Sequence, residues 1–423
     1  MSLFNRRVVS WALYDLANSA FATTVLAVFF PIFFQRYFSA GADPATSTSR
    51  LGFASALASI LVAAAAPLLG SIADKGGAKK KLLALFAVLG VVNTGGLFFV
   101  AEGAWLPALV LFGVATVGFA GGNIFYDALL VGVAPKEKVD VVSALGFAVG
   151  YAGGGALLAV NAWMVNAPET FGLDDASHAV RVAFLLTALW WAAFTVPLLV
   201  FVDEPAGESR SFFAAAKAGV DELKETVREL KKLRMVALFL LAYWFYIDGV
   251  DTVIRMATDY GARLGLEAGD MVTALLVTQF VGVPAALVFG KVGERVGAKR
   301  MIGVGIAVYI VVVAWGAFID STREFYMLAI FVGLVQGGVQ SLSRSLFVRI
   351  IPRSKASELF GFYNMLGKFA AVLGPMLMAF VALFTESPRW PLLSIISLFV
   401  IGGLVLTRVD ERAGEQMAKD YDA

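Results

Sequence analysis

The sequence contains no cysteine, one histidine (His178) and few charged residues. Without cysteine there are no disulfides and no thiolate chemistry, and a lone histidine excludes histidine-rich metal sites, so we expect neither a metal nor a cofactor. A soluble domain is about 25% charged. This 423-residue chain is 16% charged, which is too little to coat several water-facing surfaces.

The net charge is also small. It is +2 at pH 7, from 34 basic and 32 acidic residues. This balance argues against a nucleic-acid partner, because domains that bind nucleic acids carry a basic surface. Apolar residues are abundant, at 59% of the chain, and they include 35 Phe alongside 42 Gly. Such a composition is typical of membrane-spanning helices.

Twelve apolar segments are long enough to cross a bilayer, which takes about 20 residues. Lipid offers no partner for backbone polar groups, so each segment is expected to be a helix. The sequence therefore predicts an all-α integral membrane protein with twelve transmembrane helices. The segments lie at 9–36, 51–73, 82–101, 105–133, 140–165, 180–202, 235–261, 271–291, 301–319, 325–350, 357–384 and 390–407.

Basic residues are concentrated in alternate connections between these segments. If the N-terminus is cytoplasmic, most of the 34 Lys and Arg residues fall in cytoplasmic connections. Cytoplasmic loops carry an excess of Lys and Arg, so we expect both termini in the cytoplasm.

An internal repeat divides the chain into two halves. Residues 70–80 read GSIADKGGAKK, residues 290–300 read GKVGERVGAKR, and the two align without gaps. Each copy follows the second span of its half, so we predict two six-helix bundles in parallel repeat. The predicted divisions are an N-terminal bundle at 1–202, a linker at 203–234, a C-terminal bundle at 235–407 and a cytoplasmic tail at 408–423.

The linker mixes acidic and basic residues at helical spacings. This pattern favours an amphipathic helix on the inner membrane surface, and a flexible charged linker is the alternative.

The first copy of the repeat, G-x-x-x-D-K-x-G-x-K, resembles the signature loop of the major facilitator superfamily. Its glycines permit a tight turn, and its basic cluster suits an anionic lipid surface. Ala78 and Ala298 stand where that signature usually carries a basic residue. The loop residues expected to take part in gating are Gly70, Asp74, Lys75, Gly77, Lys79, Gly290, Glu294, Arg295, Gly297 and Lys299.

Four further segments resemble the vacuolar amino-acid effluxer-like family of major facilitators. The resemblance implies a secondary transporter, with export of neutral amino acids from the vacuole in fungal members, and the fold implies a monomer. The segments are WALYDLANSAFATTV at 11–25, FYDALL at 125–130, YIDGVDT at 246–252 and SLSRSLFVRIIP at 341–352.

Polar residues inside the predicted spans form stripes along single helix faces, at spacings of three or four residues. An ionisable residue at mid-bilayer costs about 2.5–3.5 kcal/mol to insert, which makes it a functional candidate. Four of the five stripes belong to spans one, four, seven and ten, which line the central cavity in the fold that the resemblance implies. The candidates for substrate binding or proton coupling are Asp15, Asn18, Asn123, Tyr126, Asp127, Asp248, Asp251, Arg255, Gln336, Gln340, Arg344, Asn364 and Lys368.

Charges of opposite sign lie at similar depths in the two halves. Asp127 and Arg344 each precede a proline by eight residues, which is about 12 Å of helix. We expect Asp15 and Asp127 to pair with Arg344 and Lys368 when the cytoplasmic side is closed, and rocking of the halves to separate them. The alternative is that each charge is neutralised within its own half.

The glycine-rich stretches of spans five and eleven, at 146–158 and around Gly361, Gly367 and Gly374, are expected to form the sliding contact between the halves. Small residues let helices approach closely.

A carboxylate in a low-dielectric cavity takes up a proton more readily, so Asp15, Asp248 or Asp251 is a candidate proton carrier. A purely structural pair with Arg255 is the alternative. An amino acid would need an anion for its ammonium and a cation for its carboxylate, for which Asp15, Asp248 and Arg344 are favoured. The sequence thus favours a secondary active transporter of a small polar organic solute, an amino acid above all, with proton coupling.

Two other functions stay open: an exporter of amphipathic drugs or lysolipids, and a transport-inactive receptor or scaffold. No nucleotide-binding motif supports an ATP-driven pump, and no nucleophile–base set supports an enzyme. The expected partners are a small solute, protons and the lipid bilayer. The expected location is multi-pass in the plasma (inner) membrane of a bacterium.

Overall fold

The structure is a computed structural model of the chain, described here for residues 5–204, 233–263, 265–385, 387 and 389–423. Within these ranges the side chains of 256–260, 262–263, 268 and 368–372 are not described. The linker predicted at 203–234 lies almost entirely outside the described residues.

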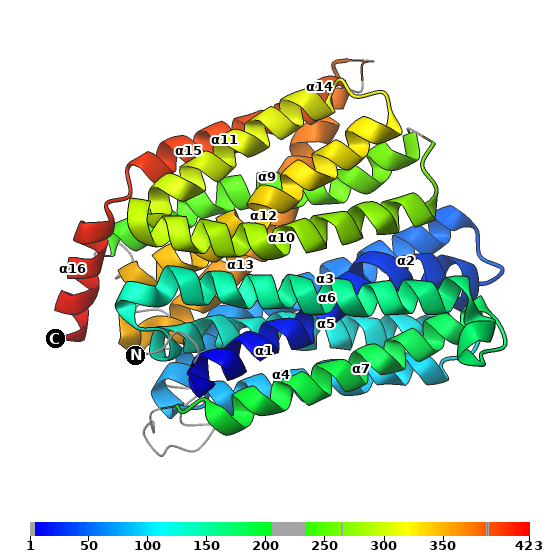
Figure 1. Ribbon diagram of the computed structural model, residues 1–423, viewed down its shortest axis with the longest axis horizontal. Coiled ribbons are helices and arrows are strands. Elements are labelled where there is room, and N and C mark those ends of the chain that lie inside the picture. The colour runs from blue at the N-terminus through cyan, green and yellow to red at the C-terminus, as the bar shows by residue number, and fades with distance from the viewer. Residues whose placement is uncertain (1–4, 205–232, 264, 386, 388) are drawn as a thin grey trace.

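The described chain is helical, and its long helices run side by side along the long axis of the molecule (Figure 1). The elements before the linker are α1 (Arg6–Ala20), η1 (Phe21–Phe29), α2 (Phe30–Phe33), η2 (Phe34–Phe38), α3 (Pro44–Gly76), α4 (Lys79–Gly96), η3 (Leu97–Phe99), α5 (Trp105–Val133), η4 (Lys136–Lys138), α6 (Val139–Asn166), η5 (Pro168–Phe171) and α7 (Ala176–Phe201). Those after it are α9 (Arg234–Arg263), α10 (Ala268–Val296), α11 (Ala298–Gly316), α12 (Thr322–Ile350), η6 (Arg353–Lys355), α13 (Ala356–Ala382), α14 (Arg389–Ser394), α15 (Ile396–Thr407) and α16 (Glu411–Asp422).

Eleven helices of the described chain are long and apolar enough to cross a membrane. They correspond to eleven of the twelve predicted spans. The remaining predicted span, 357–384, coincides with α13, a 27-residue helix whose described apolar stretch is Leu373–Ala382. The all-helical membrane fold is therefore confirmed, and the count of twelve spans stays a prediction.

Several helix ends differ from the predicted boundaries. α3 begins at Pro44, well before residue 51, because the Asp43 side chain caps it by accepting a hydrogen bond from the Thr46 backbone N–H at 2.9 Å. Bonds from the Thr46 hydroxyl and backbone hold the pKa of the Asp43 carboxyl below its usual value. The last predicted span is divided between α14 and α15. The segment predicted as a tail forms the helix α16.

The first span is one continuous helix, Arg6–Phe38, that is not uniformly α-helical. Two segments, Phe21–Phe29 and Phe34–Phe38, are π-helical. They lie on either side of Pro31, which has no backbone N–H to donate. π-Helical turns inside α-helices are frequent at functional sites, and the first of these begins one turn after the polar stripe of this span.

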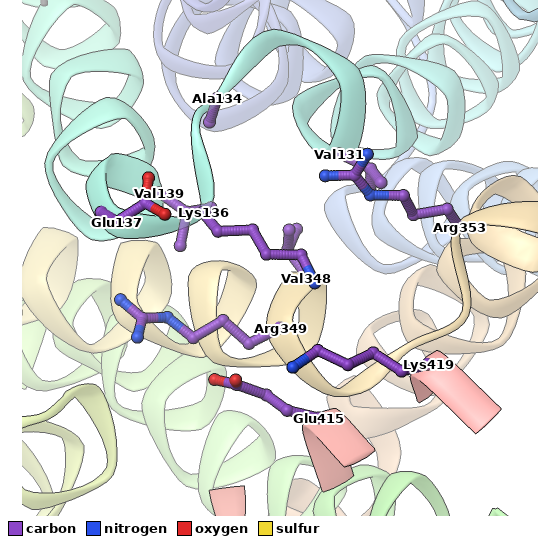
Figure 2. Close-up of a pocket in the computed structure, with 10 residues that line it drawn as sticks. All are labelled: Val131, Ala134, Lys136, Glu137, Val139, Val348, Arg349, Arg353, Glu415 and Lys419. Carbon is purple, nitrogen blue, oxygen red and sulfur yellow. The ribbon is translucent and has the colours of Figure 1, made fainter. Parts of the chain in front are cut away.

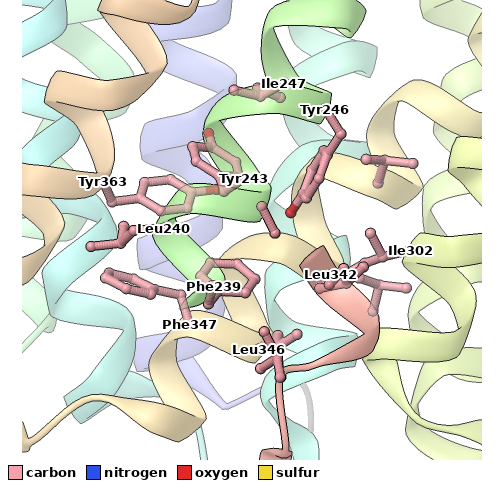
Figure 3. Packing of buried hydrophobic residues seen from close by; sticks show 14 of the residues in the cluster. Phe239, Leu240, Tyr243, Tyr246, Ile247, Ile302, Leu342, Leu346, Phe347 and Tyr363 are labelled. Atoms are coloured by element: carbon pink, nitrogen blue, oxygen red, sulfur yellow. The ribbon is translucent and has the colours of Figure 1, made fainter. Parts of the chain in front are cut away.

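Buried apolar residues form separate interiors before and after the linker. One cluster draws nearly all its members from residues 233–409 and is rich in stacked rings (Figure 3). In it the ring centroids of Tyr243 and Tyr363 lie 4.0 Å apart. Two other clusters, one around Trp11 and one around Phe30, belong to residues 5–204. We call residues 5–204 the N-terminal half and residues 233–407 the C-terminal half.

The two most extensive helix contacts between the halves are those of α6 with α10 and of α3 with α13, and α12 and α13 also contact α6 and α5. Glycine permits the second contact, because a Cβ on Gly70 would lie 2.2 Å from the Ser357 carbonyl oxygen, and one on Gly361 would lie 2.5 Å from the Ala66 carbonyl oxygen. The glycine-rich helices α6 and α13 do contact the other half. Their partners are α10 and α3, which the glycine pattern does not indicate.

Both chain termini lie at the same end of the bundle (Figure 1). We call this the terminal end; it holds the N-terminus, the turns η4 and η6, and α16. The prediction that this end is cytoplasmic stays a prediction.

Candidate functional site

A buried arginine of α12 lies where the two halves meet. Arg344 is 3% exposed. Its guanidinium donates a hydrogen bond to the Asp127 carboxylate of α5 at 3.0 Å, and it lies 3.7 Å from the Asp15 carboxylate of α1. A cation of the C-terminal half is thus in contact with two anions of the N-terminal half, as the matched depths of these residues suggest.

Ser143 of α6 completes the surroundings of the guanidinium. Arg344 Nε donates to the Ser143 hydroxyl at 2.9 Å, and a terminal nitrogen donates to the Ser143 carbonyl oxygen at 2.9 Å. The Ser143 hydroxyl in turn donates to the Ser341 carbonyl oxygen of α12 at 2.7 Å. Each of the three guanidinium nitrogens therefore has an acceptor. A serine in a glycine-rich helix has no pattern that marks it in the sequence.

Three aromatic rings surround the same guanidinium. Its carbon lies 4.9 Å from the centroid of Trp11, 5.3 Å from that of Tyr126 and 4.5 Å from that of Phe147. Rings within about 6 Å attract a cation through their π faces. They also keep water away from the ion pairs, which strengthens each electrostatic contact.

Neutral donors hold the two carboxylates in place. The Tyr126 hydroxyl donates to Asp15 at 2.9 Å, and the Asn364 amide of α13 donates to Asp127 at 3.2 Å. Trp11 fixes Tyr126 in turn, because its indole N–H donates to the Tyr126 carbonyl oxygen at 3.0 Å. The candidates Asp15, Tyr126, Asp127 and Asn364 therefore meet at one place.

The charges in this cluster do not balance among the described side chains. Two carboxylates face one guanidinium, which gives a net charge of −1 if both are ionised. An uncompensated buried charge is costly, so a proton or a further cation would stabilise the cluster. Lys368 lies on α13 one turn after Asn364, but its side chain is outside the described part of the structure, so its predicted role stays a prediction.

The remaining polar residues of these helices take other partners. The Asn18 amide donates to the Asn123 side chain at 2.6 Å, within the N-terminal half. The Tyr151 hydroxyl donates to Gln340 across the halves at 3.5 Å. Gln336 is half-buried one turn earlier on α12.

A second buried carboxylate lies on α9. Asp248 is fully buried; one oxygen accepts the backbone N–H of Gly374 at 3.1 Å and the hydroxyl of Thr252 at 3.3 Å. The next residue, Pro375, has no backbone N–H to donate within α13, so Asp248 binds the backbone beside a proline inside a helix that continues to Ala382. Its other oxygen has no hydrogen-bond partner among the described groups.

The stripe that begins at Asp248 does not stay in the interior. Asp251 is half-buried and Arg255 is exposed. Arg255 lies toward the outer end of this stripe, and the roles predicted for Asp251 and Arg255 stay predictions.

The two signature loops contact the opposite half in different ways. Asp74 accepts the backbone N–H of Glu358, in the first turn of α13, at 2.9 Å, and its carboxylate lies 2.8 Å from the Lys79 ammonium. Glu294 of α10 instead forms an ion pair with the Lys138 side chain of η4.

Equivalent glycines do the same thing in both copies of the signature loop. One adopts a positive φ, and the other allows a close approach of two helices. Gly77 and Gly297 adopt φ values of +54° and +103°, which favour glycine. A Cβ on Gly290 would lie 2.4 Å from that of Ala144 in α6.

The basic residues of the second loop behave differently from those of the first. Lys299 donates to the carbonyl oxygens of Thr407 and Val409, at 2.9 and 2.6 Å, and so stays within its own half. Arg295 is exposed and Lys75 is half-buried. Lys79 also stays within its own half, where it pairs with Asp74, and the gating role predicted for Lys79 and Lys299 stays a prediction.

Asp140 is a cross-half contact that the sequence patterns do not indicate. It is fully buried at the start of α6 and accepts hydrogen bonds from Ser345 and Arg349 of α12, both at 2.6 Å. Its position at the first residue of a predicted span made it look like an ordinary boundary residue.

Solved structures show the class of fold. The proton:xylose symporter XylE matches with a TM-score of 0.77 at 12% identity, covering 99% of this chain and 98% of that one. The human organic anion transporter MFSD10 (TETRAN) matches with a TM-score of 0.71 at 14% identity, covering 95% and 99%. At such identities the likeness shows the fold alone, which is that of the major facilitator superfamily.

The sequence shows the family. The chain belongs to the Atg22-like vacuole effluxer family, whose model matches residues 42–419. The uncharacterized MFS-type transporter YxiO of Bacillus subtilis is 38% identical over 432 residues, covering 100% of this chain and 99% of that protein. Autophagy-related protein 22 of Saccharomyces cerevisiae is 24% identical, covering 85% and 76%.

These comparisons confirm the family that the motifs resemble. The chain is an MFS-type transporter and a multi-pass integral membrane protein, and its bacterial relative is consistent with a plasma-membrane location.

Proposed function

We propose that this chain is a secondary active transporter that moves a small polar organic solute, in the favoured case an amino acid, by alternating access with proton coupling. The observation that carries the proposal is the buried contact of Arg344 with Asp15 and Asp127. It joins the halves in the middle of a major facilitator fold. Alternating access requires the halves to rock about a site at their interface, so these bonds must break in each cycle.

Once these bonds break, the charged groups that formed them need new partners. Separation leaves a guanidinium in one half and two carboxylates in the other, and a buried charge that loses its partner costs about 3–5 kcal/mol. A zwitterion supplies both missing charges, with its carboxylate toward Arg344 and its ammonium toward Asp15 or Asp127. Since every nitrogen of Arg344 already has an acceptor, such a solute would displace Asp127 rather than add to it.

The excess of carboxylates among the described side chains supports proton coupling. A proton on Asp15 or Asp127 would remove the net negative charge of the closed cluster. Asp248 is a further proposed carrier, because one of its oxygens is buried without a described partner while the other accepts the Gly374 backbone N–H of α13. Protonation there would weaken the bond to Gly374 and so couple the proton to helix movement.

The proposal places the terminal end in the cytoplasm and treats the two halves as six-helix bundles that act as a monomer. The excess of basic residues in the connections at this end supports the orientation. The family description as vacuole effluxers supports movement of a cargo across a membrane.

The test is solute uptake by purified protein in proteoliposomes. Amino acids, sugars and amphipathic drugs would be screened with and without an imposed pH gradient. We expect saturable amino-acid transport that follows the gradient and is lost in Asp15→Asn and Asp248→Asn. The control is Asp320→Asn, an exposed carboxylate at the other end of the bundle, which should retain full transport.

The other results would reassign the function. A signal from drugs or lysolipids alone would replace the cargo class. If folded protein transports none of the solutes in the screen, the result would contradict transport of these solutes and favour a receptor.

A further inference from the structure

A pocket of about 340 Å³ opens at the terminal end between the two halves and α16 (Figure 2). This volume is in the range of small-molecule sites. The N-terminal half contributes Lys136 and Glu137, the C-terminal half contributes Arg349 and Arg353, and α16 contributes Glu415 and Lys419. Four cations and two acids therefore surround a space that three separate parts of the chain enclose.

The internal repeat explains how two of these cations come to face the same space. Pro135-Lys136 opens the turn η4, and Pro352-Arg353 opens the turn η6, at equivalent places in the two halves. Lys136 and Arg353 are thus symmetry mates that line one pocket across the interface. Like charges repel at such a place, so the arrangement favours a negative group between them.

The described acids do not neutralise these cations. Within the described part of the chain, no ion pair joins Lys136, Arg353 or Lys419 to a carboxylate. Arg349 is bound to Asp140, yet its Nε is buried with no hydrogen-bond partner among the described groups. Counting Asp140 with the two lining acids, four cations face three carboxylates, which leaves an excess of one positive charge.

Helix α16, which forms one side of the pocket, is held at both of its ends. The carboxylate of Asp422, at the end of α16, accepts hydrogen bonds from the Arg353 backbone N–H at 2.7 Å and the Ser354 hydroxyl at 2.6 Å. At the start of α16, Glu411 accepts the Lys299 backbone N–H at 3.1 Å. Both ends of the helix are therefore bound to the C-terminal half. Lys136 and Lys419 extend toward the middle of the pocket from opposite sides (Figure 2).

We propose that this pocket binds a phosphate group, which bridges Lys136 and Arg353 from the two halves with Lys419 of α16 and so holds the terminal end closed. Phosphate accepts several charge-assisted hydrogen bonds from Lys and Arg at once. A ligand that contacts both halves only while they are together favours that state by its differential affinity. The phosphate belongs either to a soluble metabolite or to the headgroup of an anionic lipid, and in both cases the site is separate from the proposed solute site around Arg344.

Binding can be measured without any transported solute. Purified full-length protein in detergent would be titrated with inorganic phosphate and with pyrophosphate at constant ionic strength, and thermal unfolding would be followed by tryptophan fluorescence. We expect a saturable rise in Tm. The double variant Lys136→Gln, Arg353→Gln should bind about a hundredfold more weakly, because each of the two charged hydrogen bonds lost weakens binding by about tenfold.

Two further variants separate binding from folding. Lys419→Gln removes an exposed cation that lines the pocket and should weaken binding in the same direction. Arg412→Gln removes an exposed cation from the same helix outside the pocket and should bind as the wild type does.

A second experiment, in lipid nanodiscs, distinguishes the source of the phosphate. The same variants would be compared in nanodiscs of phosphatidylcholine alone and with added phosphatidylglycerol. Stabilisation by phosphatidylglycerol that depends on Lys136 and Arg353 assigns the group to a lipid. Stabilisation by pyrophosphate alone assigns it to a soluble metabolite. No saturable effect from any of these probes, or an equal effect in the double variant, would overturn the proposal.

Discussion

The interface between the halves differs along its length. At the terminal end and in the middle, charged groups such as Asp74, Glu294 and Arg344 bond across it. Toward the opposite end the same helices meet through apolar and small residues. There Gly155 of α6 lies against Gln279 Cβ and the Phe280 ring, and Leu276 of α10 packs on the core of the N-terminal half.

This difference indicates which end has to be released. A charged hydrogen bond is directional and is lost when its groups separate by about an ångström, whereas apolar contacts can slide. We therefore propose that the polar end acts as a latch and that the contact of α6 with α10 serves as a surface on which the halves can move. Variants that each remove one bond of this polar end should differ in the size of their effect. The effect should be larger where the bond is more deeply buried and where the lost partner is charged.

The largest effect is expected for Arg344→Gln. It leaves Asp15 and Asp127 facing each other in the interior without a cation. Loss of one partner of a buried pair costs about 3–5 kcal/mol, so transport in proteoliposomes should fall at least about a hundredfold. Arg344→Lys should recover little, because an ammonium cannot make the same set of bonds. Arg408→Gln, an exposed cation at the terminal end, is the control, and near-normal transport by Arg344→Gln would contradict the assignment.

A large effect is also expected for Asp127→Asn, and it should appear in the resting conformation. Because the chain has no cysteine, a single Ser357→Cys replacement reports exposure of the buried contact between α3 and α13. Thiol labelling should be several-fold faster in Asp127→Asn than in the parent. Asp15→Asn should increase labelling less, since Asp15 lies 3.7 Å from the guanidinium and Asp127 lies 3.0 Å from it. The same labelling rate in all three proteins would mean that this bond does not hold the end closed.

An intermediate effect is expected for Gly70→Ala. Its Cβ would lie 2.2 Å from a carbonyl oxygen of α13, so one backbone has to shift. Overpacking of this kind costs about 1–3 kcal/mol and should act against the closed state alone, as seen by the Ser357→Cys label. Gly52→Ala on the same helix has open space around its Cβ and serves as the matched control. If both variants label alike, the close approach of α3 to α13 has no role in closure.

The smallest effect is expected for Glu294→Gln. The side chains of Glu294 and Lys138 are 25% and 39% exposed, and such pairs contribute about 0.2–1 kcal/mol. Asp74→Asn should do more harm, because Asp74 is 6% exposed at its side chain and binds a backbone N–H. Labelling at low and high salt checks this, since only the Glu294 effect should disappear at high salt. The reverse order would contradict the ranking by burial.

The sequence was most informative where a residue type is rare in its surroundings. Arginine and aspartate inside apolar spans mark Arg344 and Asp127, and matched distances from two prolines place them at one depth. Ser143 and Ser345 carry no such mark, since serine is tolerated on any helix face. Asp140 is hidden because it stands at a predicted boundary.

Elements that depend on long-range contacts also cannot be predicted from the sequence. A helix as short as α16 is marginal by itself, and it forms here against the ends of α12 and η6. The partners of α6 and α13 follow from how the two halves are placed, which no local pattern specifies.

We propose that the Asp127–Arg344 contact holds the terminal end closed, and a distance measurement across this end can test it. Spin labels on Lys81→Cys and Arg300→Cys, two exposed positions in opposite halves near this end, would report their separation by pulsed electron paramagnetic resonance in lipid. We expect a short distance in the otherwise unchanged protein and a larger population at long distance in Asp127→Asn. An identical distance distribution in Asp127→Asn and in Arg344→Gln would contradict it.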